Sequence, residues 1–277
     1  MLVGIFAAIS AAMAALVCLG AEAFSGLGWL WMLPVSFVGS FLVLLLLWVV
    51  VLIVMAARVR MDEVQLTDDP VYRKVIHLTA DAVIFLMRIR IHMEGLEKAP
   101  KTGRFLLVCN HLDDTDPVVL LRAFPKSQLA FISKRENDKK FIIGPFLRQI
   151  GCQPINPEND REALKTIINC IRMIKEDQAS IAVFPEGYVS MDRKLHPFRP
   201  GVFRIAQKTQ VPIVVCTLRD TYHIFPNMLR LKASDVTLHV LGTIMPEDYN
   251  GMNTVQLGEQ VHAMMAEDLG PDLVLQP

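Results

Sequence analysis

The sequence FLLVCNHLDDTD, residues 105–116, indicates how the chain folds. It opens with an unbroken apolar run, which is typical of a short strand buried on both faces. Such strands belong to parallel sheets covered by helices, and α/β proteins gather their sites in the loops at the carboxyl ends of these strands. Residues 105–108 therefore predict an interior strand, and the polar loop that follows is a candidate site.

Short apolar runs and helical patterns alternate through the rest of the chain. Further strands are expected at 88–94, 129–132, 153–156, 181–184, 213–217 and 236–241, and helices at 69–86, 116–123, 141–149, 160–175, 202–208 and 254–269. This alternation predicts an α/β fold with a mostly parallel sheet flanked by helices. The helix at 69–86 is amphipathic, and it either packs on the domain or lies on a membrane. Residues 270–277 are expected to form a loose tail.

The N-terminus is apolar enough to enter a membrane. Glu22 is the only charged side chain before Arg58, and the uncharged segments on either side of it reach the roughly 20 residues that a bilayer span needs. Residues 22–28 are rich in small side chains and are expected to form a turn. A cleaved signal peptide is the alternative, but the first segment lacks a basic n-region. We expect residues 1–57 to form a membrane-anchoring two-helix hairpin, followed by a second domain at 58–277.

The positive charges next to this hairpin predict its orientation. Arg58 and Arg60 follow the second segment, and no Lys or Arg lies between the two segments. Cytoplasmic flanks are the ones that carry Lys and Arg. The expected protein is therefore integral to the cell membrane, with its second domain in the cytoplasm.

Charge and cysteine content limit the function classes. The 28 Lys and Arg residues balance 28 Asp and Glu residues, whereas a nucleic-acid-binding protein shows a basic excess. The five cysteines lie far apart without a C-x-x-C motif, which predicts reduced, mostly buried thiols and neither a disulfide framework nor a zinc site. We expect no cofactor and no metal.

The loop after the first run contains the spacing H-x-x-x-x-D, from His111 to Asp116. An aspartate that accepts a hydrogen bond from one imidazole nitrogen leaves the other free to take a proton from a hydroxyl group. Two alternatives stay open from the residues alone: a structural histidine bonded to a backbone carbonyl, or a metal-dependent hydrolase in which Asp113, Asp114 and Asp116 supply oxygen ligands. The neighbouring Cys109 is expected to be a buried strand residue that points to the opposite face.

A second motif, FPEG at residues 184–187, ends another apolar run. Together the two motifs resemble those of the glycerolipid acyltransferase family. Residues 110–116 match the first family block, 133–151 are similar to the second, 184–187 match the third, and VPIV at 211–214 is like the fourth. The four blocks occur in the family's order, behind an apolar hairpin.

The resemblance implies a reaction and a set of site residues. His111 would be the general base for the acceptor hydroxyl, and Asp116 would orient it. The substrate-binding residues would be Lys134, Arg135, Arg161, Glu186 and Gly187. The family transfers an acyl chain from an acyl-carrier-protein or coenzyme A thioester to a lysophospholipid, here 1-acylglycerol 3-phosphate, and the product is phosphatidic acid. Partners would thus be these two substrates and membrane lipids.

Two departures from the family pattern concern the acceptor's phosphate. The second block usually carries an Asp-Arg pair, where this chain has Asn156 and Pro157, and the third commonly continues Thr-Arg-Ser, where this chain reads YVS at 188–190. Arg161 is a candidate to restore the first charge, and Arg193, Lys194 and Arg199 are candidates to restore the second. The losses leave two alternatives open: another lysolipid acceptor, or a non-catalytic lipid-binding member of the family.

Overall fold

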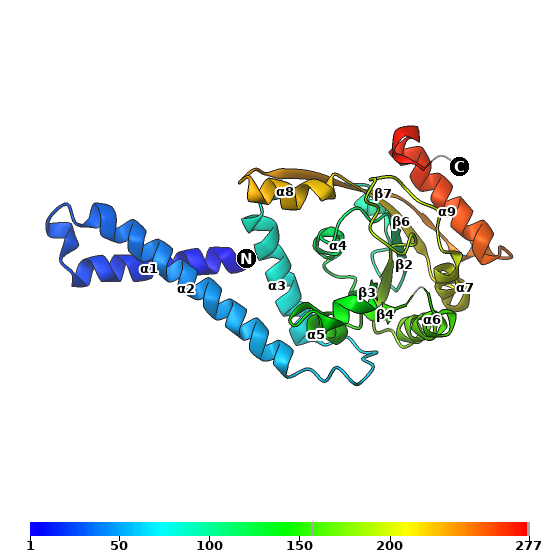
Figure 1. The fold of residues 1–277 in the computed structure, drawn as a ribbon, viewed down its shortest axis with the longest axis horizontal. Coiled ribbons are helices and arrows are strands. Elements are labelled where there is room, and N and C mark those ends of the chain that lie inside the picture. The colour runs from blue at the N-terminus through cyan, green and yellow to red at the C-terminus, as the bar shows by residue number, and fades with distance from the viewer. Residues whose placement is uncertain (157, 276–277) are drawn as a thin grey trace. The chain divides into compact units, whose positions relative to one another are not determined.

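The computed structural model describes residues 1–156 and 158–275 (Figure 1). Contacts within the chain divide it into two units, Met1–Arg60 and Met61–Pro277.

The first unit is a pair of apolar helices, α1 (Leu2–Gly20) and α2 (Trp29–Ala57), with a short 3-10 turn between them. At 1.5 Å per residue they are about 28 and 43 Å long, against a bilayer core of about 30 Å. Both are long and apolar enough to cross a membrane. The rings of Phe6 and Trp48 meet edge-on with centroids 6.4 Å apart, so the two helices pack on each other. The predicted pair of apolar helices joined by a turn is confirmed.

The second unit is built on a sheet with the strand order β1-β7-β6-β2-β5-β3-β4. The strands are β1 (Ile89–Glu94), β2 (Leu106–Cys109), β3 (Leu129–Lys134), β4 (Gln153–Ile155), β5 (Ser180–Val183), β6 (Ile213–Arg219) and β7 (Ser234–Ile244). From β6 to β4 all neighbours are parallel, whereas β7 runs antiparallel to β6 and β1 runs parallel to β7. The predicted mostly parallel sheet is confirmed.

Helices cover both faces of this sheet. They are α3 (Pro70–Leu86), α4 (Asp116–Ala123), α5 (Ile143–Gln149), α6 (Asp160–Lys175), α7 (Arg204–Thr209), α8 (Ile224–Leu229) and α9 (Thr254–Leu269). The longer ones begin at strong caps: the Asp69 carboxylate accepts the first N–H groups of α3, and Asn253 forms a capping box with Gln256 at the start of α9.

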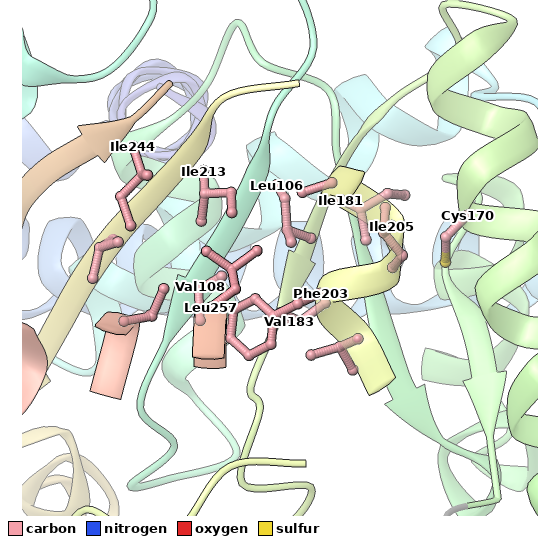
Figure 2. Packing of buried hydrophobic residues seen from close by; sticks show 14 of the residues in the cluster. Leu106, Val108, Cys170, Ile181, Val183, Phe203, Ile205, Ile213, Ile244 and Leu257 are labelled. Atoms are coloured by element: carbon pink, nitrogen blue, oxygen red, sulfur yellow. The ribbon is translucent and has the colours of Figure 1, made fainter. Parts of the chain in front are cut away.

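The core has two halves because successive residues of β2 point to opposite faces. Leu106 and Val108 pack with Phe203 of the 3-10 turn before α7 and with Leu257 of α9 (Figure 2). Leu107 and Cys109 pack on the other face, with Val119 and Leu120 of α4. Cys109 is fully buried in that half, as predicted.

Of the two alternatives for the helix at 69–86, the structure shows that it packs on the domain. Tyr72, Ile76 and Ile84 of α3 pack against the core, while Val71 and Phe85 stay exposed. Its inner stripe therefore belongs to the domain, and its outer residues remain available to solvent or lipid.

Two expectations differ from the structure. Helix α8 is absent from the predicted elements, because its six residues are too few to show a helical period. The expected loose tail is wrong for residues 271–275: the N–H of Leu195 donates to Leu273 O at 2.7 Å, and the N–H of Leu275 donates to Leu195 O at 3.0 Å. Leu273 and Val274 also pack on the core, which explains why the segment is held. Residues 276 and 277 lie outside the described residues.

Candidate functional site

The candidate site lies at the carboxyl end of β2, in the middle of the sheet. Asn110, the first residue after the strand, is buried, and its amide bonds to both backbone groups of Leu218 on β6: Oδ1 accepts from N at 2.7 Å and Nδ2 donates to O at 3.0 Å. The side chain thereby continues the ladder past the end of β2. This anchor fixes the point where the loop leaves the sheet, one residue before His111.

His111 and Asp116 are brought into direct contact. Nδ1 of His111 lies 2.8 Å from Oδ2 of Asp116, which also accepts the N–H groups of Leu112 at 2.7 Å and Asp113 at 2.9 Å. Asp116 is fully buried at the start of α4, where the helix dipole favours a negative charge. A carboxylate there accepts a hydrogen bond from a proton-bearing Nδ1, and in the neutral imidazole Nε2 then carries the lone pair. The His111 side chain is 14 % exposed, so the ring reaches the surface of the site.

The imidazole ring is also held by stacking. Its plane lies at 14° to the ring of Phe184, with centroids 4.1 Å apart. Phe184 directly follows β5, the neighbour of β2, so the two family motifs meet through these rings. The hydrogen bond and the stacked ring together leave His111 little rotational freedom.

The residues of the alternative metal site are used differently. Asp113 Oδ1 accepts from both the N–H and the hydroxyl group of Thr115, at 2.9 and 2.7 Å, and Asp116 bonds to the loop. Across residues 1–156 and 158–275, no cluster of three or more His, Cys, Asp or Glu side chains has a geometry suited to a metal.

Glu186 ties three backbone segments together. It is 1 % exposed; its Oε1 accepts the N–H of His111 at 2.9 Å, and its Oε2 accepts the N–H of His196 at 3.0 Å and the hydroxyl of Ser190. Burial raises the pKa of the Glu186 carboxyl, and these hydrogen bonds oppose that rise. The carboxylate thus stands behind the histidine as a brace that joins the His111 loop to the loop after FPEG.

Gly187 adopts a left-handed conformation with φ of +83°, which glycine tolerates best. Its N–H closes a turn onto Phe184 O at 3.0 Å. A Cβ at this position would lie 3.0 Å from Nε and 3.1 Å from Cδ of Arg199, so the arginine side chain lies directly over the glycine. The N–H of Arg199 donates to Pro185 O at 2.8 Å, which fixes the arginine beside the FPEG turn.

Three predicted substrate-binding residues, Lys134, Arg135 and Arg161, lie at the same edge of the sheet as His111. Within the described residues, no hydrogen bond or ion pair joins them to His111, Asp116, Glu186 or Gly187. Lys134 ends β3, which only β5 separates from β2. Arg135 bonds to Glu162 Oε2 at 2.9 Å, and both line a hollow of about 310 Å³ with Arg148 and Lys165. Arg161 is exposed in the first turn of α6. Asn156 also lines the hollow, and Pro157 lies outside the described residues.

Two backbone amides beside Gly187 have no hydrogen-bond acceptor within the described residues. The N–H of Gly187 is used in its turn, and the N–H of Ser190 donates to His111 O at 2.8 Å. Between them, the amides of Tyr188 and Val189 donate to no group in the described residues.

A charged cluster beside the site joins α9 to the sheet. Asp268 accepts from Thr217 Oγ1 at 2.6 Å, from Nδ1 of His239 at 2.7 Å and from Arg219. Burial opposes ionisation here, yet these hydrogen bonds lower the pKa of Asp268 below its usual value. The five cysteines are free and buried, as predicted, and burial raises the pKa of the Cys109 thiol, which keeps it protonated beside the motif.

Known proteins are similar to this chain in sequence. Residues 90–219 match the family model described as Acyltransferase. A 1-acyl-sn-glycerol-3-phosphate acyltransferase of Cocos nucifera is 26 % identical over 194 residues, covering 70 % of this chain and 62 % of the relative. A chloroplastic protein of the same name from Arabidopsis thaliana is 33 % identical over 162 residues, covering 57 % and 45 %. The chain thus spans less than two thirds of the length of these curated relatives.

A solved structure has the same fold. The 1-acyl-sn-glycerophosphate acyltransferase PlsC of Thermotoga maritima superposes with a TM-score of 0.54 at 24 % identity, covering 71 % of this chain and 81 % of that one. The buried His111–Asp116 contact and the FPEG turn both lie inside residues 90–219, the segment of this chain that matches the Acyltransferase family model.

Proposed function

We propose that the protein transfers an acyl chain from a thioester to the free hydroxyl group of a lysophospholipid. His111 Nε2 takes the proton from that hydroxyl as its oxygen attacks the thioester carbonyl carbon. The tetrahedral intermediate collapses, the carbon–sulfur bond breaks, and the proton passes from His111 to the leaving sulfur. The observation that carries this proposal is the 2.8 Å contact between Nδ1 and the buried Asp116, which presents Nε2 as a base.

The oxyanion of that intermediate needs hydrogen-bond donors. We assign this role to the N–H groups of Tyr188 and Val189, which have no acceptor within the described residues. Gly187 contributes its conformation and not its N–H, because that group already closes the turn onto Phe184.

The proposed acceptor is 1-acylglycerol 3-phosphate, and the product is phosphatidic acid. The names of the relatives support this choice. Arg199 supports it as well. It lies over Gly187, two residues before position 189, where the family commonly has an arginine and this chain has valine. Arg199 would then bind the phosphate together with Lys134, and Arg135 and Arg161 would add positive charge further along the same edge.

The proposed donor is acyl-carrier protein or coenzyme A carrying the acyl chain, and the proposed location is the cell membrane. The apolar hairpin would anchor the enzyme where both lipid chains reside. Arg58 and Arg60 directly after α2 favour a cytoplasmic catalytic unit, because cytoplasmic flanks carry the positive charges.

Activity of the reconstituted full-length protein tests the proposal. A panel of lysophospholipids with one labelled acyl thioester should give transfer to the phosphate monoester, and His111→Ala should lower kcat by about 10²–10⁴-fold. His92→Ala, an exposed histidine on β1, is the matched control and should stay active.

Each other outcome has a defined meaning. Preference for a phosphate-free or zwitterionic lysolipid would replace the acceptor but keep the chemistry. Near-normal turnover by the His111→Ala variant would overturn the mechanism. Lysolipid binding without turnover by the wild type would identify a non-catalytic member of the family.

A further inference from the structure

Large apolar side chains are exposed together where α3 ends and α8 lies. Phe85 and Leu86, at the end of α3, are 66 % and 47 % exposed, and Phe225 and Leu229, on α8, are 55 % and 68 % exposed. Leu231, just after α8, is 80 % exposed. We call these five residues the apolar patch. Contiguous exposed apolar surface of this kind marks a site of interaction with a protein or a membrane.

The two segments form one continuous surface although about 140 residues separate them. Nη1 of Arg88 donates to Leu231 O at 2.7 Å, and the N–H of Ser234 donates to Arg88 O at 3.2 Å. Residues 84–86, 88–90 and 233 also line a shared hollow of about 460 Å³. Figure 1 shows α8 beside the end of α3.

Positive charge surrounds the patch. Residues 84–90 and 225–235 contain four basic side chains, Arg88, Arg90, Arg230 and Lys232, and one acidic side chain, Asp235. All four basic side chains are exposed. Apolar side chains flanked by Lys and Arg suit the headgroup region of an anionic bilayer, where each basic residue contributes about 1 kcal/mol. A protein partner with an apolar surface alone would not use this net positive charge.

The apolar patch also lies at the end of the sheet where β2 ends and His111 follows. Cys109 at the end of β2 is level with Cys216 on β6, which is level with Val240 on β7. Because β7 is antiparallel to β6, its first residue, Ser234, lies beyond Val240 in the direction of the carboxyl end of β2. Ile89, the first residue of β1, is paired with Ser234. A bilayer in contact with the patch therefore faces the edge of the sheet that carries the candidate site.

We propose that the apolar patch docks the catalytic unit onto an anionic lipid surface, as a contact separate from the α1–α2 hairpin. The hairpin keeps the chain in the membrane, and the patch turns the site toward the lipids from which the acceptor comes. This role extends the proposed function, but its geometry can be tested without any turnover.

A fluorescent label at position 231 tests the contact directly. Full-length protein carrying Leu231→Cys is labelled with an environment-sensitive nitrobenzoxadiazole dye and reconstituted into nanodiscs of phosphatidylcholine with about a third phosphatidylglycerol. The five native cysteines are buried, so the new one reacts preferentially. The matched control is Val255→Cys, 50 % exposed on α9, whose first turn follows the opposite end of β7.

The expected result is blue-shifted emission at position 231, at least halved by doxyl-labelled lipid, with water-like emission at position 255. Water-like emission at both positions would overturn the proposal. Blue-shifted emission that doxyl lipid does not quench would overturn it too, because protein, either this chain or a second copy, would then cover the patch.

The contribution of the basic side chains is tested in the same labelled Leu231→Cys protein. Replacing Arg230 and Lys232 with glutamine, or using phosphatidylcholine alone, should reduce quenching at position 231 severalfold. Equal quenching on both lipid compositions would show that anionic lipid is not the recognised surface. Because no measurement in this series uses acyl transfer, its failure is distinguishable from failure of the proposed function.

Discussion

Replacing Glu186 with glutamine tests whether this carboxylate holds the histidine loop in place. Glutamine keeps one acceptor oxygen and introduces an NH₂ group. If that group takes the place of Oε1 it faces the N–H of His111, and if it takes the place of Oε2 it faces the N–H of His196. In either orientation one backbone donor loses its acceptor in a site that is 1 % exposed.

The magnitude follows from that loss. A buried donor without a partner costs about 1–3 kcal/mol, and the lost charge weakens the remaining hydrogen bonds. We expect Glu186→Gln to lower the free energy of unfolding by about 2–4 kcal/mol. We also expect kcat to fall, because the loop that carries His111 loses its brace. The matched control is Glu162→Gln, whose exposed pair with Arg135 is worth less than about 1 kcal/mol.

Two measurements check this prediction. Denaturant unfolding in micelles compares the two variants, and hydrogen exchange follows the amides of His111, Ser190 and His196. Equal stability of the two variants, with wild-type protection at these amides, would refute the brace. A raised KM for the acceptor with unchanged stability would instead indicate that Glu186 contacts the substrate directly.

Three further predictions concern neighbouring residues. Arg199→Gln should raise the KM for the phosphate acceptor at least about 10-fold, since a charge-assisted hydrogen bond is worth about 1.5–3 kcal/mol, and should leave the KM for a phosphate-free acceptor unchanged. The control is Arg204→Gln at an exposed position, and equal KM values for the two variants would exclude Arg199 from the phosphate site. Gly187→Ala should lower the free energy of unfolding by about 1–2 kcal/mol because of the left-handed backbone, and further because the new methyl group displaces Arg199. The measurement is a lower Tm, and an unchanged Tm would contradict this prediction. Because the pKa of Asp268 is lowered in the fold, its ionised form stabilises the protein at neutral pH, and this stabilisation disappears as pH falls through that pKa. Asp268→Asn should therefore destabilise at pH 7 and have little effect in strong acid, and a pH-independent loss in unfolding titrations would disprove the linkage.

Most elements of the second unit were predictable because their periodicity is local. The strand at 105–108 and the helices at 160–175 and 254–269 have buried faces that repeat at the spacing of the element, so burial is visible in the sequence. Helix α8 was not predictable, since it is shorter than two turns, and neither was the full length of β7. The tail was predicted loose because its anchor on Leu195 is about 80 residues away.

The α/β class, the apolar hairpin and the pair His111 and Asp116 can be read from the sequence, because each depends on residues close together in the chain. The surroundings of that pair depend on tertiary contacts. Phe184 and Glu186 reach His111 from the neighbouring strand and its loop. His196 bonds to Glu186 from the far end of that loop, and Arg199 lies over Gly187. No local spacing encodes those contacts, since they depend on the order of strands in the sheet. The same order brings the end of α3 and α8 together on the side of the sheet that carries His111.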